Sequence, residues 1–172
     1  TNFTFLFVGR LIKDKGIIEF IEAAKLIKLK YSTVNFHVLG SFCPRNTSAI
    51  KKSEMNSWVS DKIISYLGFT DQVKTVMENS DCLVLPSYRE GLSKALIEGS
   101  SMSLPIITTD TPGCKDVIIE NETGFLCQTK DSYDLFLKMQ KMLTLSSEQR
   151  KKMGTASRTR AETFFDVKDV IR

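Results

Sequence analysis

The sequence predicts an α/β fold: a doubly wound, parallel six-stranded sheet of the Rossmann type, followed by carboxyl-terminal helices. Short apolar runs rich in β-branched and aromatic residues alternate with longer segments of helical period. Several of these runs are apolar throughout, which is typical of parallel strands covered by helices on both faces. The 172 residues, 42% of them apolar, are enough for one domain with its own core.

Six strands are expected at the apolar runs, in chain order at residues 4–8, 34–39, 63–66, 82–85, 105–108 and 124–126. Between the first two, apolar residues recur at intervals of three and four, which predicts a helix over residues 16–30. A second helix is expected after Thr70, its predicted N-cap, with Val73, Val76 and Met77 facing inward.

The segment from Ser132 to Arg172 predicts two or three further helices, one of them starting at Ser146. Right-handed crossovers favour the strand order 3-2-1-4-5-6, in which strands one and four are neighbours at the switch point. The loops after these strands, Gly9–Gly16 and Pro86–Ser93, should therefore meet at the carboxyl edge of the sheet, where such folds bind ligands.

Both loops carry residues suited to an anion. Gly9 permits a tight exit from the first strand, and Arg10 and Lys15 supply two cations that suit a diphosphate. Gly91 lets backbone approach a ligand closely, and a helix beginning near Ser93 would direct free N–H groups and its positive dipole end at a phosphate. The structural alternative is that the arginine caps the strand end and the lysine is solvated.

Glu90 and Glu98 form a carboxylate pair, the first in the loop and the second about a turn and a half into the following helix. A pair at this spacing is uninformative alone. Its position after an apolar strand at the predicted switch point, opposite a Gly-Arg loop, makes it a candidate site in which Glu90 binds sugar hydroxyls.

These residues resemble the carboxyl-terminal, donor-binding half of retaining glycosyltransferases of the GT-B fold, glycosyltransferase family 4. The resemblance runs almost end to end. It is carried by Val8–Leu11 with Lys15-Gly16, Tyr66–Phe69, Leu83–Ser87, Glu90–Leu92, Leu96–Glu98, Pro105–Thr108 and Asn121–Leu126. The chain departs from the family pattern at Ser93 and at Gly99–Ser101, without loss of a charged residue.

The resemblance implies a role for each matching residue. Arg10 and Lys15 would hold the nucleotide diphosphate, and Glu90 would contact the donor sugar, so these three are the expected catalytic residues. Glu98 would contact the ribose, and backbone between Leu67 and Phe69 would meet the base. The expected donor-binding residues are Gly9, Leu67, Phe69, Gly91, Leu92, Ser93 and Glu98.

The implied activity is transfer of a hexose or N-acetylhexosamine, with N-acetylgalactosamine as one candidate, from a UDP-sugar with retention of configuration. The implied acceptor is a polysaccharide or a lipid-linked glycan, such as one on undecaprenyl diphosphate, in bacterial O-antigen or capsule synthesis. The chain has no D-x-D motif and no His, Cys and carboxylate cluster of ligand spacing, so metal-independent transfer without a cofactor is expected.

The resemblance also implies a partner domain. Such enzymes have an amino-terminal, acceptor-binding domain, so residues 1–172 are expected to be the nucleotide-sugar-binding domain alone and inactive in isolation. The net charge of +4 is spread along the chain, so no nucleic-acid partner is expected. Four cysteines without a C-x-x-C pair fit the reducing cytoplasm, and no apolar run reaches the roughly 18 residues of a membrane span.

Peripheral contact with the cytoplasmic face of the inner membrane is also expected of the full-length protein. The cations of Arg150–Lys152, with Arg158 and Arg160, are interpreted as an exposed helix face, or alternatively as a surface for anionic lipid headgroups.

Other interpretations remain open. A non-catalytic nucleotide-sugar-binding module or a UDP-sugar epimerase would have the same sheet. A dinucleotide-dependent oxidoreductase is disfavoured because the first loop lacks G-x-G-x-x-G. His37 and Cys82 are interpreted as packed residues, and Arg89 as a solvated or ligand-contacting loop charge. For Cys114, which follows a turn near the crevice, a reactive thiol is the minor alternative.

Overall fold

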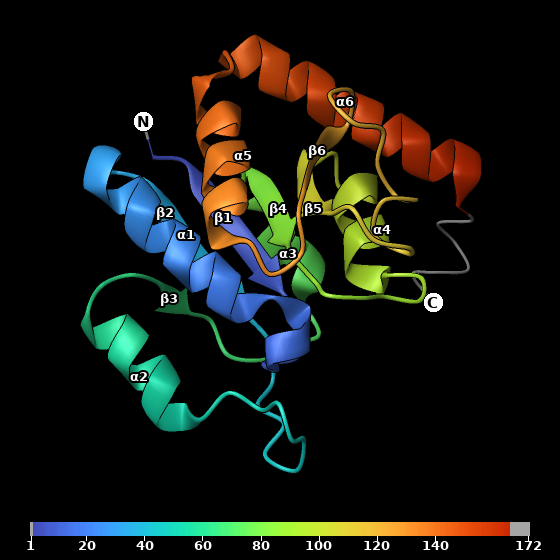
Figure 1. The fold of residues 1–172 in the computed structure, drawn as a ribbon. Coiled ribbons are helices and arrows are strands. Elements are labelled where there is room, and N and C mark those ends of the chain that lie inside the picture. Colours follow the sequence, from blue (N-terminus) through green and yellow to red (C-terminus); the bar gives the residue numbers. More distant parts are fainter. Residues whose placement is uncertain (1, 166–172) are drawn as a thin grey trace.

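The computed structural model describes residues 2–165 and contains a six-stranded sheet in the order β3-β2-β1-β4-β5-β6 (Figure 1). Every pair of neighbouring strands is parallel. The predicted fold class and strand order are therefore confirmed. The strands are β1 (Thr4–Val8), β2 (Asn35–Leu39), β3 (Ser65–Tyr66), β4 (Cys82–Leu85), β5 (Ile106–Thr109) and β6 (Gly124–Cys127).

Helices cover both faces of the sheet. The chain moves one way across the sheet from β1 to β2 and the other way from β4 to β5, so right-handed crossovers place α1 (Ile17–Lys30) and α4 (Lys94–Ser101) on opposite faces. Helix α5 (Ser132–Thr144) packs on α1, and α6 (Ser147–Phe164) packs on α4 (Figure 1). The central strands are thus buried on both sides, which explains their continuous apolar sequences.

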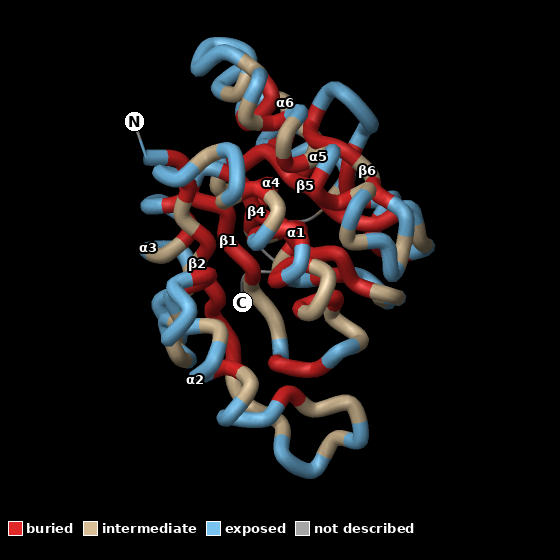
Figure 2. Tube along the Cα trace, turned by 60° about the vertical axis from the view of Figure 1, so that its left-hand side comes forward, coloured by how far each residue is buried: buried red, intermediate tan, exposed pale blue. Residues whose placement is uncertain are grey.

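The core is centred on the first two strands and α1. Phe5 stacks on Phe36 of β2 with 5.5 Å between ring centroids, and Phe7 lies 5.6 Å from Phe20 of α1. All four rings are buried. Figure 2 shows the same distribution along the chain, with buried residues in the strands and exposed ones on α2, α6 and the loops.

Some local predictions were wrong. Helix α2 (Lys52–Ser60) was not anticipated because only Met55 of its nine residues is buried, which leaves little apolar periodicity. Helix α3 (Val73–Glu78) has Gln72 as its N-cap; the Thr70 hydroxyl instead accepts a hydrogen bond from the Gln72 N–H, 3.0 Å away, in the preceding turn.

The carboxyl-terminal segment was predicted well as far as the structure describes it. Within residues 132–165 it forms the two helices α5 and α6, and residues 166–172 of the predicted tail lie outside the described part. Ser146 caps α6 as expected: its hydroxyl accepts from the Gln149 N–H, and the Gln149 side chain accepts from the Ser146 N–H. No helix among the described residues is long and apolar enough to cross a bilayer.

Candidate functional site

The loops after β1 and β4 meet at the carboxyl edge of the sheet, because these strands are adjacent. Lys15 Nζ lies 2.6 Å from Glu90 Oε1, although the two residues are 75 positions apart. Their side chains are 18% and 10% exposed, so the ion pair is largely screened from water. The Tyr88 N–H donates to the Asp14 carbonyl at 2.8 Å and fixes the two backbones against each other.

Gly16 makes this contact between the loops possible. Its φ of +81° lies in the left-handed region, and a Cβ there would lie 2.0 Å from the Pro86 carbonyl oxygen. The Ser87 hydroxyl donates to the Asp14 carbonyl at 3.1 Å across the same junction. The backbones of the two loops are thus closely packed, and they carry the side chains of Lys15 and Glu90.

The segment after β5 packs against the backbone of Glu90. Gly113 has a φ of +84°, and a Cβ on it would lie 2.2 Å from the Glu90 carbonyl oxygen and 2.1 Å from that of Gly91. The Thr109 hydroxyl donates to the Ser87 carbonyl at 2.6 Å. Sequence reasoning missed this support, although the Pro-Gly pair at 112–113 signals a turn after the fifth strand.

Helix α4 begins at the candidate site. Ser93 is its N-cap, with the hydroxyl accepting from the Leu96 N–H at 3.3 Å, so the predicted helix start is confirmed. Glu98 lies one turn further along, partly buried, with Oε1 3.8 Å from Lys94 Nζ. No atom lies within 4 Å of the position of a Cβ on Gly91. The close approach of its backbone to a ligand therefore stays a prediction.

Exposed apolar side chains surround this edge. Leu67, Phe69 and Leu92 are 40%, 75% and 60% exposed. The first two follow β3, whose loop is held by the hydrogen bond from the Gly40 N–H to the Gly68 carbonyl. Apolar surface at a carboxyl edge suits a flat ligand such as a base.

Arg10 is exposed and lines a hollow of about 490 Å³ with the loop after β2. Gly9 donates its N–H to the Leu39 carbonyl at 3.1 Å, which joins the β1 and β2 exits. Among the described residues Arg10 has no hydrogen-bonded or ion-paired side-chain partner, whereas Lys15 is paired with Glu90. In the first loop, the side chain of Lys15 is therefore fixed by an ion pair and that of Arg10 is not.

Other residues singled out by sequence lie elsewhere. His37 is half-buried in the middle of β2, where burial lowers its pKa. Cys82 is buried as expected, and Cys114 is buried too, at 0% exposure, which contradicts the minor alternative that it is a reactive thiol. Among residues 2–165, no group of three or more His, Cys, Asp or Glu is placed to hold a metal ion.

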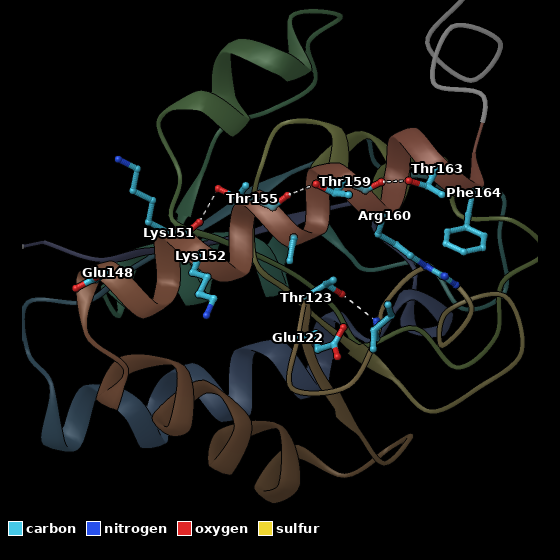
Figure 3. Close-up of a pocket in the computed structure, with 12 residues that line it drawn as sticks. Glu122, Thr123, Glu148, Lys151, Lys152, Thr155, Thr159, Arg160, Thr163 and Phe164 are labelled. Atoms are coloured by element: carbon cyan, nitrogen blue, oxygen red, sulfur yellow. Dashed lines mark hydrogen bonds between the residues drawn. The ribbon is translucent and has the colours of Figure 1, made fainter.

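Another hollow, of about 800 Å³, lies away from these loops, between α6 and residues 119–123 (Figure 3). Several of its polar groups already bind the protein. The hydroxyls of Thr155, Thr159 and Thr163 donate to carbonyls one turn back in α6, and Arg160 Nη2 donates to the Asp116 carbonyl. We assign no ligand to it.

The basic face predicted on α6 is only partly exposed. Arg150 donates to the Leu145 carbonyl and lies over the Phe3 ring. Arg158 contacts Glu162 and the Ser101 carbonyl. Arg160 Nη2 donates to the Asp116 carbonyl. Lys151, Lys152 and Arg158 are exposed, whereas Arg150 and Arg160 are half-buried, so the predicted exposed face is confirmed in part.

Comparisons with known proteins extend over almost the whole chain. The family model described as glycosyl transferases group 1 matches residues 1–160. The chain is 30% identical over 164 residues to the capsular polysaccharide biosynthesis glycosyltransferase CapM of Staphylococcus aureus, covering 95% of this chain and 42% of that protein.

A second relative is the N,N'-diacetylbacillosaminyl-diphospho-undecaprenol alpha-1,3-N-acetylgalactosaminyltransferase of Campylobacter jejuni, 30% identical over 138 residues. That match covers 80% of this chain and 35% of the relative, so the chain spans less than half the length of either relative.

Among solved structures, the C-terminal domain of the glycosyl transferase group 1 family protein LpcC from Francisella tularensis superimposes with a TM-score of 0.83 and 25% identity. The match covers 96% of this chain and 87% of that domain. The fold is therefore Rossmann-like, and its structural neighbours are GT-B glycosyltransferases, as predicted. The chain belongs to the glycosyl transferase group 1 family.

Proposed function

We propose that the chain is the donor-binding domain of a retaining glycosyltransferase that transfers a hexose or N-acetylhexosamine from a UDP-sugar. The observation that carries the proposal is the contact of Lys15 with Glu90, which joins a cation for the diphosphate and a carboxylate for the sugar at the switch point of the sheet. N-acetylgalactosamine is one candidate sugar, because the Campylobacter relative is named for its transfer.

The proposed chemistry is electrostatic. As the glycosidic bond to the nucleotide breaks, negative charge develops on the diphosphate oxygen, and Lys15, Arg10 and the N-terminus of α4 stabilise it. This fixed positive potential would serve without a metal ion or other cofactor. The contact with Glu90 holds the ammonium of Lys15 in place before the donor arrives, so little reorganisation is needed.

Glu90 has a second role in the proposal. Its Oε1 accepts from Lys15, which leaves Oε2 to accept hydrogen bonds from sugar hydroxyls. Glu98, partly buried in α4, would bind the ribose hydroxyls. The exposed apolar surface at Leu67, Phe69 and Leu92 would pack against the nucleoside.

The acceptor and the cellular location of the reaction are also part of this proposal. We propose a polysaccharide or a lipid-linked glycan, such as one on undecaprenyl diphosphate, as the acceptor, in bacterial surface-glycan synthesis. The names of the two relatives support this. A longer protein would contribute an acceptor-binding domain and act in the cytoplasm, in peripheral contact with the inner membrane.

Calorimetric titration with UDP, GDP and ADP tests the proposal on the present chain. UDP should bind most tightly, and Arg10→Ala or Lys15→Ala should weaken it about 10- to 100-fold, because a charge-assisted phosphate contact is worth about 1.5–3 kcal/mol. Lys30→Ala, an exposed cation at the other end of α1, is the matched control. Wild-type UDP affinity in both loop variants would refute the assignment.

Activity distinguishes the remaining alternatives. A longer protein that includes an acceptor domain should transfer sugar to a lipid-linked acceptor, whereas the present chain should bind UDP-sugar without transfer. Interconversion of UDP-N-acetylhexosamines in the absence of acceptor would indicate an epimerase. Binding without transfer in the longer protein would indicate a non-catalytic module.

A further inference from the structure

The hollow beside Arg10 contains a second arginine. It is lined by Arg10 from the β1 loop and by Cys43, Pro44, Arg45 and Asn46 from the loop after β2. Its volume of about 490 Å³ is in the range of small-molecule sites. It lies on the β2 side of Arg10, whereas Lys15 contacts Glu90 on the β4 side.

The loop that carries Arg45 is fixed to the β1 loop by backbone hydrogen bonds. The Leu11 N–H donates to the Ser41 carbonyl at 3.0 Å, and the Leu11 carbonyl accepts from the Ile50 N–H at 2.9 Å. Lys13 donates its N–H to the Ser48 carbonyl at 2.8 Å. The two arginines are therefore carried by one connected backbone unit.

The turn itself is also ordered from within. The Asn46 N–H donates to the Cys43 carbonyl at 2.9 Å, and the Asn46 side-chain oxygen accepts from the N–H and the hydroxyl of Ser48. Arg45 thus extends from a closed turn, which reduces the backbone entropy lost when a ligand binds.

Charge in this hollow is unbalanced. Within residues 2–165, neither Arg10 nor Arg45 has a hydrogen-bonded or ion-paired partner, and no carboxylate lines the hollow. The arginines of α6 behave differently, since Arg150, Arg158 and Arg160 each donate to a protein carbonyl. Both guanidinium groups are exposed and positively charged, so an anionic ligand in the hollow would be attracted by both.

We propose that Arg45, together with Arg10, forms a second phosphate-binding subsite beside the Lys15–Glu90 contact. The planar guanidinium group matches phosphate geometry and binds it through paired N–H donors. The inference rests on the proposed function, which provides two sources of phosphate: the diphosphate of the nucleotide donor and the diphosphate of a lipid-linked acceptor. Their shared chemistry is a phosphate group next to the donor site.

Cys43 provides a direct reporter, because it lines the hollow and is half-exposed, whereas the three other cysteines are buried. A maleimide should therefore label Cys43 selectively in the folded chain. The labelling rate would be measured with UDP and, separately, with geranyl diphosphate, a soluble prenyl diphosphate, using geraniol as its uncharged counterpart. The variants are Arg45→Ala, Arg45→Lys and the control Lys51→Ala, an exposed cation of the same segment outside the hollow.

At least one diphosphate should slow labelling of Cys43, and Arg45→Ala should weaken that ligand about tenfold, while Lys51→Ala leaves its affinity unchanged. Arg45→Lys should restore only part of the affinity, because an ammonium lacks the paired donors. If Arg45→Ala weakens binding of UDP, the phosphate in the subsite belongs to the nucleotide donor. If it weakens binding of geranyl diphosphate, the phosphate belongs to the lipid-linked acceptor.

The inference is overturned if neither diphosphate protects Cys43, if geraniol protects it equally, or if Arg45→Ala retains wild-type affinity for both probes. Failure of the proposed function is a different result. In that case the wild-type chain binds no nucleotide by calorimetry, whatever stands at position 45.

Discussion

At the scale of single residues, the candidate site depends on the contact between Lys15 and Glu90. Because both side chains are largely buried, removing one partner leaves a charge that water solvates poorly. Glu90→Gln and Lys15→Met should each lower the free energy of unfolding by about 1–3 kcal/mol. The double variant should lose less than the sum of the two, by about 1 kcal/mol or more, in urea unfolding.

The exposed pair of Lys25 and Glu22 is the matched control, with side chains 45% and 49% exposed and atoms 2.9 Å apart. Its cycle should give a coupling below about 0.5 kcal/mol, since water screens such pairs. An equal coupling for both pairs would show that burial of the site pair contributes nothing to its strength.

Tyr88 links the site to alkaline stability. Burial, the hydrogen bond that its hydroxyl donates to Glu19 at 2.9 Å, and the charges of Glu19 and Asp14 raise the pKa of Tyr88 well above its usual value. The native state therefore keeps a neutral phenol where the unfolded chain would ionise. The stabilisation is complete below about pH 10, the unfolded pKa, and is lost as pH rises towards the folded pKa.

Urea unfolding at several pH values checks this. Above pH 10 the wild-type chain should lose stability more steeply than Tyr88→Phe, by up to about 1.4 kcal/mol for each pH unit. Cys127, whose pKa burial raises to about 12, acts in the same direction but is present in both proteins. Parallel curves for the two proteins would contradict the role given to Tyr88.

At the scale of secondary-structure elements, close packing around α4 accounts for a departure from the family pattern at Gly99. Gly99 of α4 faces the sheet, and a Cβ there would lie 2.4 Å from Leu83 Cδ2 of β4. On α6, a Cβ on Gly154 would lie 2.2 Å from the Ser103 carbonyl oxygen. Larger side chains would push the helices away from this arrangement.

Two buried serines on these helices lower the stability of the fold. Among the described residues, the hydroxyls of Ser100 and Ser157 are buried without a hydrogen-bond partner. Ser157→Ala keeps the small volume and removes the unsatisfied group, so it should raise the free energy of unfolding by about 1 kcal/mol. Ser146→Ala, which removes the cap of α6, should lower it by about the same amount. A melting temperature lowered by Ser157→Ala would mean that its hydroxyl does find a partner.

Elements with a strong local signal were predictable from the sequence. The strands, α1 and the start of α6 follow from apolar runs, helical periodicity and a capping box. Helix α2 lacks such a signal because it buries one residue, and β3 is short because only Ser65 and Tyr66 pair with β2. Local signals therefore located most elements, the crossover rule gave the strand order, and α2, which is held by few contacts, was missed.

The site was predictable in part for a similar reason. The strand order placed Lys15 and Glu90 at one edge, and the structure brings them into contact. The support from Gly113 and the second arginine at position 45 were missed, since both depend on how loops fold against each other. Loop conformation is set by long-range backbone contacts that leave little trace in local sequence patterns.

At the scale of the whole molecule, the carboxyl edge differs from the rest of the surface. It holds the two arginines of the hollow, which have no partner in the described part of the chain, the Lys15–Glu90 contact and the exposed Phe69. Three of the five cations of α6 instead donate to carbonyls of the protein itself. The sheet contributes to this edge from both sides of the switch point, with β1 to β3 on one side and β4 to β6 on the other. A ligand bound across the edge would connect the two halves.

Ligand binding should therefore stabilise the entire fold. A ligand that binds only the folded state at 100 times its Kd adds about 2.7 kcal/mol, which for a chain of this size raises Tm by roughly 5–10 °C. We expect that rise with UDP in differential scanning calorimetry, as one cooperative transition. Lys15→Ala should lose most of it at the same UDP concentration, and Lys30→Ala should keep it. Because Arg10 is exposed, the shift should also shrink as salt is raised. Two separate transitions, with only one moved by UDP, would show that the ligand contacts one half of the sheet and does not bridge the switch point.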